Sequence, residues 1–363
     1  MDTKVPVATG VPLQDPAIDI QMQLDAFLRA LNCLSQTGHE ALGDMLTGLC
    51  RVTRVDHNLW DAVSKHPLGP KKRTRFMYAA FKGDLDRVIF LHNRGADPTS
   101  VLICAFKAPD GGREACIAFL LAKYPEEVLK KDMNGMLPLH HACEKDVKLD
   151  VVMALLEACP EAVLSEDKER MTPLHHACKN GATLDVVMVL LAKCPDALRE
   201  RGYNGMLPLH YACKNGAALD VVIALLAACP ETASKKDYHG KLPLHYVCAN
   251  GAELDVVAVL LASYPEAANV KTPRGLLPLH YACVNRESLE LVEALLAVYP
   301  EAVRVKSYLG MLPLHYAFAS GAELVKAALL KAYPEAESVE CYKRKLPLQY
   351  TGTNEAELNM MVA

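Results

Sequence analysis

Leu137-Pro138-Leu139-His140 is the stretch that decides the fold, because the same kind of motif returns along the chain at a fixed interval. The interval is 35 residues, and one copy, Thr172–His175, begins with threonine in place of leucine. A last copy follows after 34 residues and ends in Gln349 instead of histidine. A period of this length indicates a stack of units, each too small to bury its own apolar face. The other copies begin at Leu207, Leu242, Leu277 and Leu312.

One unit, residues 132–167, predicts a turn followed by two short helices. Gly135 supplies the positive φ of a tight turn, and Pro138 suits the first turn of a helix, where a missing N–H costs nothing. We expect that helix to end near residue 145, and a second helix to run from about residue 149 to Pro160, which ends it. The apolar stripe of the second helix consists of Val152, Leu155, Leu156 and Cys159.

A turn, two short helices and a period in the thirties resemble the ankyrin repeat, whose Thr-Pro-Leu-His signature stands intact at Thr172–His175. The tetratricopeptide repeat has a similar length but lacks the glycine turn and the Pro-Leu-His opening. The resemblance implies an all-α solenoid of stacked helix-turn-helix units. It extends upstream in weaker form, with Ile103 in the position of the histidine. We therefore expect an ankyrin-repeat array over residues 71–363, with eight repeats and a partial ninth.

Several residues depart from the family pattern. Most units place leucine where the family prefers threonine, so we expect the histidine to bond to backbone atoms instead of a hydroxyl group. Arg170, Arg286 and Arg344 replace turn glycines in their units, and Asp146 replaces another. A side chain opposes the backbone angle that glycine adopts there, which predicts distorted turns in those units.

The chain before the array divides into two parts. We expect residues 1–16 to be flexible and residues 17–70 to form three short helices, from the spacing of their apolar residues. One interpretation is a helical cap, because the first repeat of a solenoid needs its apolar flank covered. The other is an F-box-like module, since three short helices that lead to Asn58-Leu59-Trp60 are similar to that family, although its Leu-Pro opening is absent.

Charge and hydropathy exclude several classes of protein. The formal net charge of −4 argues against binding of nucleic acid through phosphates. No stretch approaches 18 uninterrupted apolar residues, so we expect no membrane span, and the N-terminus lacks the pattern of a secretory signal. We expect a monomer in the cytoplasm. The basic cluster at residues 70–75 leaves nuclear import open, although it also coincides with the turn of the first repeat.

The 13 cysteines are interpreted as core residues. Cys143, Cys178 and Cys213 recur every 35 residues, and Phe318 occupies an equivalent position, so packing accepts an aromatic ring there. His140 and Cys143 share a helical face, but a zinc site needs four ligands within about 2.3 Å of the metal. Neighbouring helices pack about 8–10 Å apart, which separates successive pairs. We expect no metal, no cofactor and no catalytic site, and hence no enzyme.

The resemblance implies a protein-binding surface made by the turn tips and the first helices, on the concave face of the array. Tyrosine and methionine are frequent at these positions, and both are common where proteins bind one another. A second interpretation is that some of them pack against the adjacent turn. The sequence predicts a protein-interaction module or scaffold, or alternatively a substrate adaptor of a larger complex, possibly a ubiquitin ligase, that binds through its N-terminal helices. The candidate partner-binding residues are Tyr203, Met206, Tyr238, His239, Arg274, Tyr308 and Met311.

Overall fold

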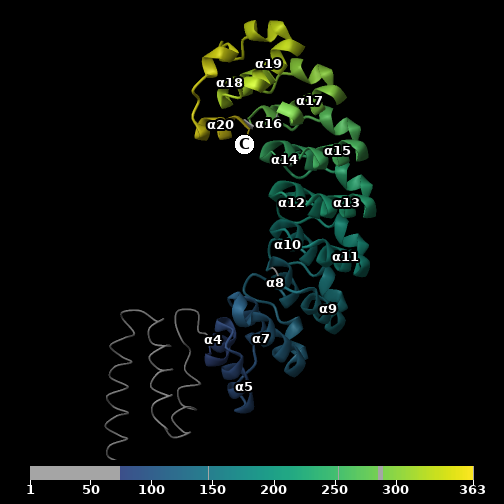
Figure 1. Ribbon diagram of the computed structural model, residues 1–363, viewed down its shortest axis with the longest axis vertical. Helices are drawn as coiled ribbons and strands as arrows, with labels where there is room; N and C mark the ends of the chain where they lie inside the picture. The colour runs from purple at the N-terminus through teal and green to yellow at the C-terminus, as the bar shows by residue number, and fades with distance from the viewer. Residues whose placement is uncertain (1–73, 146, 252, 285–288, 363) are drawn as a thin grey trace, which may run out of the picture. The chain divides into compact units, whose positions relative to one another are not determined.

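Pairs of short helices follow one another along the chain, each pair joined to the next by a turn (Figure 1). The computed structural model describes residues 74–145, 147–251, 253–284 and 289–362, and no β-strand occurs within these ranges. The chain divides into Met1–Tyr78 and Ala79–Ala363, and the fold described below is that of the second unit. The expected flexible N-terminus, the helical cap or F-box-like module, Asp146 and Arg286 lie outside the described residues.

The helices alternate between two neighbouring rows, and both rows run along the length of this unit (Figure 1). From residue 101 onward, each helix of the first row contacts the next helix of that row, and the helices of the second row also contact one another in order. The first row, after α4 (Arg75–Lys82) and α6 (Val101–Phe106), is α8 (Pro138–Glu144), α10 (Pro173–Asn180), α12 (Pro208–Asn215), α14 (Pro243–Asn250), α16 (Pro278–Val284) and α18 (Pro313–Ser320). The second row, after α5 (Leu85–Asn93) and α7 (Asp110–Lys123), is α9 (Leu149–Ala158), α11 (Leu184–Lys193), α13 (Leu219–Ala228), α15 (Leu254–Ser263), α17 (Leu289–Val298) and α19 (Glu323–Ala332).

Short 3-10 helices connect the second-row helices from α7 onward to the following turn. Proline begins every one of them, and it also ends the preceding helix because it cannot donate a backbone N–H. They are η1 (Pro125–Leu129), η2 (Pro160–Leu164), η3 (Pro195–Arg199), η5 (Pro230–Ser234), η6 (Pro265–Asn269), η7 (Pro300–Arg304) and η8 (Pro334–Ser338). A further 3-10 segment, η4 (Tyr203–Gly205), forms one turn tip, and the chain closes with η9 (Pro347–Tyr350) and α20 (Glu355–Val362).

The boundaries of α10 show why the first-row helices are short. Pro173 is its first residue, and the N–H of Thr172 donates to Nδ1 of His175 at 3.1 Å, which caps the N-terminus. The helix ends at Gly181, whose φ of 71° is the left-handed conformation that glycine adopts readily.

The core lies between the two rows and between successive pairs. Leu155 and Leu156 of α9 are 2% and 0% exposed, as the apolar stripe predicted. Because one helix pair cannot bury this much apolar surface alone, each pair is stabilised by the next. The predicted all-α fold of stacked helix-turn-helix units is therefore confirmed for the described residues.

The prediction of distorted turns at Arg170 and Arg344 is wrong. Both adopt the left-handed conformation, with φ of 61° and 56°, like the glycines that they replace. The N–H of Arg170 donates to the carbonyl of Asp167 at 3.0 Å, and Gly135 makes the equivalent bond at 2.9 Å. The surrounding stack holds the turn in shape, and the arginine bears a backbone strain of about 1–2 kcal/mol.

Candidate functional site

Backbone hydrogen bonds join several pairs of neighbouring turns along one edge of the array. The N–H of Lys168 donates to the carbonyl of Asn134 at 2.9 Å, and Tyr238 donates to Asn204 at 2.9 Å. The same bond joins Tyr308 to Arg274 at 2.8 Å. These bonds fix the spacing of the tips, so their side chains are presented at regular intervals along a rigid scaffold.

Three predicted binding residues, Tyr203, Tyr238 and Tyr308, lie on these tips and are 56%, 67% and 54% exposed. The ring of Tyr238 also rests on the preceding turn, because a Cβ placed on Gly205 would lie 2.4 Å from its Cδ1 atom. Packing against the adjacent turn and exposure to solvent therefore occur in the same residue. His239 and Arg274 are exposed on the same edge. The edge thus carries large aromatic side chains whose position is fixed on one side.

The prediction that Met206 and Met311 face solvent is wrong, since they are 2% and 1% exposed. In most units the residue before the Leu-Pro or Thr-Pro step lies beneath the turn, whereas Lys345 in the last unit is exposed. The carbonyl of Met206 accepts from Gly202 across that turn at 2.9 Å, and Nε2 of His175 lies 3.2 Å from the same oxygen. The two side chains belong to the core and are removed from the candidate surface.

Sequence reasoning missed Lys241, which occupies the same position beneath its turn. Its ammonium group lies over two aromatic rings, 5.6 Å from the centroid of Tyr246 and 4.9 Å from that of Tyr281. Burial lowers the pKa of Lys241, and the nearby cations Lys214 and Arg274 lower it further, against the opposing effect of Asp237. The signal in the sequence was the change to lysine at a position that is apolar in most units.

The recurring histidine holds neighbouring units together. In α8, Nδ1 of His140 accepts from the N–H of Leu137 at 3.1 Å, so Nε2 carries the proton and donates to the carbonyls of Ser165 at 2.9 Å and Met171 at 3.2 Å. Burial lowers the pKa of His140 to about 4, which keeps the ring neutral at pH 7. The expected backbone bonding of this histidine is confirmed, and both nitrogens are used structurally.

The residue after each histidine ties the helix to its own turn. The hydroxyl of Tyr246 donates to Oδ2 of Asp237 at 2.5 Å, and that of Tyr316 donates to Oγ of Ser307 at 3.1 Å. In α10 an imidazole takes this role, where Nε2 of His176 lies 2.9 Å from Oδ2 of Asp167. These turns are therefore anchored at their first residue, whereas in the turn 202–206 the hydroxyl of Tyr211 donates to the carbonyl of Tyr203 at 3.3 Å.

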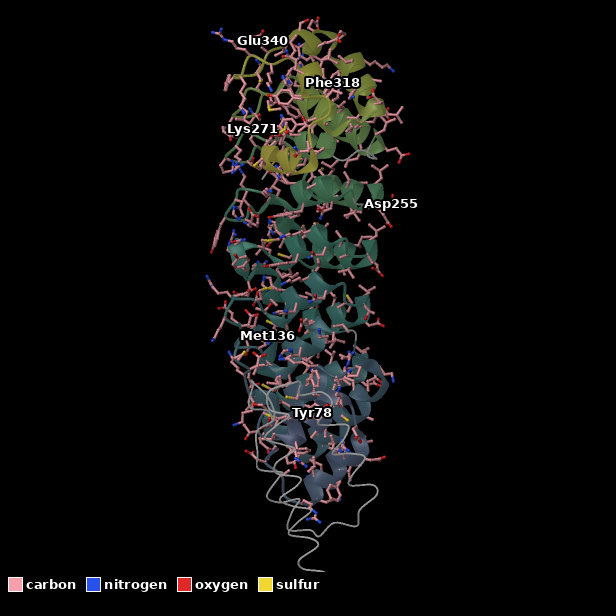
Figure 2. All side chains as sticks on the ribbon, turned by 90° about the vertical axis from the view of Figure 1, so that its left-hand side faces the viewer. Tyr78, Met136, Asp255, Lys271, Phe318 and Glu340 are labelled. Carbon is pink, nitrogen blue, oxygen red and sulfur yellow. The ribbon has the colours of Figure 1, made fainter. Side chains whose placement is uncertain are left out.

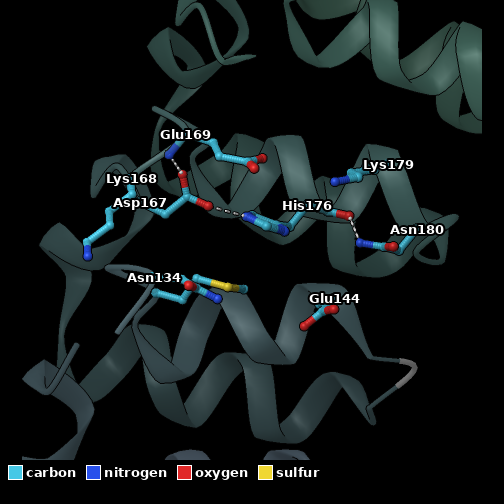
Figure 3. A pocket seen from close by; sticks show the side chains of 9 residues that line it. Asn134, Glu144, Asp167, Lys168, Glu169, His176, Lys179 and Asn180 are labelled. Atoms are coloured by element: carbon cyan, nitrogen blue, oxygen red, sulfur yellow. Dashed lines mark hydrogen bonds and ion pairs between the residues drawn. The ribbon is translucent and has the colours of Figure 1, made fainter. Parts of the chain in front are cut away.

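A polar pocket of about 380 Å³ opens between the turns and the helices α8 and α10 (Figure 3). His176 and Asp167 lie along one side of it, and Oδ1 of Asp167 also accepts from the N–H of Glu169 at 2.8 Å. Glu144 and Lys179 line it as well, so the pocket offers groups of both signs to a polar side chain. The full lining is Asn134, Met136, Glu144, Asp167, Lys168, Glu169, His176, Lys179 and Asn180.

The recurring cysteines lie in the core as free thiols. Cys143, Cys178 and Cys213 are buried and unbridged, as predicted. Burial raises the pKa of Cys178 to about 12, so the thiol stays protonated at pH 7. Within the described ranges, no three side chains of the metal-binding types gather in one place.

Comparison with known proteins identifies the repeat. The family described as ankyrin repeats (3 copies) matches residues 102–197, 148–238, 184–271 and 244–339. Together these matches span about two thirds of the chain. No curated protein matches the sequence. In the part of the chain that the structure describes, no helix has the length and apolar character needed to cross a membrane.

Proposed function

Because this chain belongs to the ankyrin repeat family, whose members typically bind other proteins, we propose that it is a protein-interaction module or scaffold that binds through its turn tips and first-row helices. Ankyrin repeats are generally not enzymatic. The observation that carries the proposal is the column of exposed tyrosines, Tyr203, Tyr238 and Tyr308, on a backbone-bonded edge. Rigid, half-exposed aromatic residues concentrate the energy of protein binding when a partner covers and dries them.

The buried groups support a binding function rather than catalysis. The histidines of the recurring motif bond to backbone atoms, and burial raises the pKa of Cys143 and Cys178. A catalytic site needs a nucleophile or base that can reach a substrate. Free thiols also favour a reducing compartment, and we propose that the protein acts in the cytoplasm as a monomer.

The experiment compares two double variants of the full chain against a partner captured by affinity purification from cells that express it. Tyr203→Ala with Tyr238→Ala should weaken binding about 30-fold or more, because a covered tyrosine contributes about 2 kcal/mol or more. The control is Met188→Ala with Ile223→Ala, which removes exposed apolar residues from the second-row helices α11 and α13. The control should bind like the unmodified chain.

Thermal melting separates a lost surface from a lost fold. The tyrosine variant should melt within a few degrees of the unmodified chain, because both rings are more than half exposed. A large drop in melting temperature would assign the tyrosines a structural role. If the tyrosine variant binds normally while the control fails, the binding surface lies on the second-row helices and the proposal is wrong.

A further inference from the structure

Charge is distributed unevenly across the units that contain the exposed tyrosines. Four successive turns, residues 201–206, 236–241, 271–276 and 306–311, carry several lysines and arginines, and their only acidic residue is Asp237. That carboxylate is 5% exposed, and it accepts from Tyr246 and from two backbone N–H groups of its own turn. We name this surface the basic tip edge, and its cations are Arg201, Lys236, Lys241, Lys271, Arg274 and Lys306.

Three of the four second-row helices in these units carry the opposite sign. Asp220 in α13, Asp255 in α15, and Glu290 and Glu293 in α17 are exposed, and these three helices contain no lysine or arginine. The fourth helix, α19, contains one glutamate and two lysines. Lys271 and Asp255 lie at opposite edges of the unit (Figure 2). The chain therefore has a net charge of −4 as a whole, while one edge is positive. Net charge alone could not indicate this.

Positive charge is concentrated near the centre of this edge, where two ammonium groups lie near the same aromatic ring. Lys214 lies 5.9 Å and Lys241 5.6 Å from the ring centroid of Tyr246. Burial lowers the pKa of Lys241, and repulsion by the nearby cations Lys214 and Arg274 lowers it further. An anion that binds there relieves this repulsion, which adds to the attraction of each separate charge.

We propose that the basic tip edge binds an extended, acidic segment of a partner protein, whose apolar side chains cover Tyr203, Tyr238 and Tyr308. This inference rests on the proposed function and names the chemical class of the partner. Neighbouring units stack about 8–10 Å apart and an extended chain advances about 3.3 Å per residue, so one tip meets every third residue. The four turns therefore fit a segment of about ten residues.

A protein segment fits this edge better than a nucleic acid does. The acidic second-row helices and the negative net charge repel a long polyanion, whereas a short acidic segment meets the basic edge alone. Three of the four turns place a tyrosine two residues after a cation, and the third turn has Pro273 at that position, which matches a segment that carries both apolar and acidic residues. Electrostatic complementarity of this kind raises the association rate and selects the partner.

The test uses the full chain and a library of random dodecapeptides displayed on phage. Selected peptides should carry a net negative charge together with aromatic or aliphatic residues, and their affinity should fall as salt is raised from about 0.15 to 0.5 M. The double variant Lys236→Glu with Lys271→Glu should weaken the binding of these peptides about tenfold or more. The matched control, Lys193→Glu with Lys331→Glu, changes the net charge equally at exposed positions of α11 and α19 and should leave binding unchanged.

Each other outcome overturns the inference in a recognisable way. Peptides that are neutral or basic, or that tolerate Lys236→Glu with Lys271→Glu, would overturn the acidic class, while loss of binding in Tyr203→Ala with Tyr238→Ala would preserve the proposed function. A library that yields no binder would also overturn the inference that the edge binds an acidic segment. The proposed function would then be tested only by the binding of the captured partner to the tyrosine variant. Tighter, charge-dependent binding of a 20-residue oligothymidine would assign the edge to nucleic acid.

Discussion

His245 of α14 contacts Tyr281 of α16 edge-on, with ring centroids 5.6 Å apart and an interplanar angle of 88°. Nε2 of the same imidazole lies 3.1 Å from the carbonyl of Val270, in the segment between the two units. The pair therefore joins adjacent units by ring packing and by a hydrogen bond at once. Equivalent pairs run through the array, among them His175 with Tyr211 at 5.7 Å.

Acid should destabilise the array between about pH 6.5 and 4. Burial lowers the folded-state pKa of His175, His210 and His245 from 6.5 to about 4. As the pH falls, these histidines therefore take up protons in the unfolded chain before they do so in the folded protein. Their contribution to the free energy of unfolding is complete above pH 6.5 and declines as the pH falls toward 4. Each histidine contributes a slope of about 1.4 kcal/mol per pH unit within the window. Urea melts at pH 7, 6 and 5 measure the slope.

His245→Gln tests whether the histidines cause that slope. Glutamine keeps the cap at the helix start, because the N–H of Leu346 donates to Oε1 of Gln349 at 2.8 Å in the last unit. The variant should lose about 1–3 kcal/mol at pH 7, since it gives up the bond to Val270. Its free energy of unfolding should depend less steeply on pH, because unfolding of the variant takes up about one proton fewer. An unchanged slope would mean that other groups control the acid response.

Leu155→Ala should lower the free energy of unfolding by about 2–5 kcal/mol, because the side chain is 2% exposed between two helix pairs. Met153→Ala in the same helix is the control. That methionine is 41% exposed, and its truncation should change stability by no more than about 0.5 kcal/mol. Similar denaturant midpoints for the two variants would contradict the stacking described here.

Arg170→Gly should stabilise the protein by about 0.5–1 kcal/mol, because glycine adopts the φ of 61° without strain. The loss of its ion pair with Glu166, at 3.6 Å and largely exposed, should matter little. Gly205→Ala should have the opposite effect, since the new Cβ would lie 2.4 Å from Cδ1 of Tyr238. Thermal melts of both variants test whether the first raises and the second lowers the melting temperature. A lower melting temperature for Arg170→Gly would show that Arg170 does not strain the backbone.

Thiol labelling of the native protein should modify Cys194 before Cys178 and Cys248. Cys194 is half-buried, whereas the other two lie in the core, where burial raises their pKa. Mass spectrometry after a brief exposure to a maleimide identifies the labelled peptides. Rapid modification of Cys178 in the folded protein would show that the first-row helices open more readily than this packing allows.

The sequence by itself determined the fold, because the information was periodic. Pro138, Gly135 and the apolar stripe of the second helix each specify a local conformation, and their recurrence every 35 residues specifies the stack. The burial of Leu155 and of Cys178 followed from the same pattern. Three exposed tyrosines were also predicted, because the tip of a turn faces solvent in any stacked arrangement of these units.

Only the tertiary structure decided which side chains share a surface. Met206 and Tyr203 lie three residues apart in one turn, yet the methionine is buried and the tyrosine exposed, because the next unit covers one side of the turn. The grouping of Lys214, Lys241 and Arg274 likewise arises because three successive units pack against one another. The repeat period predicts that neighbouring units contact one another, whereas the direction in which each side chain points depends on how those units pack.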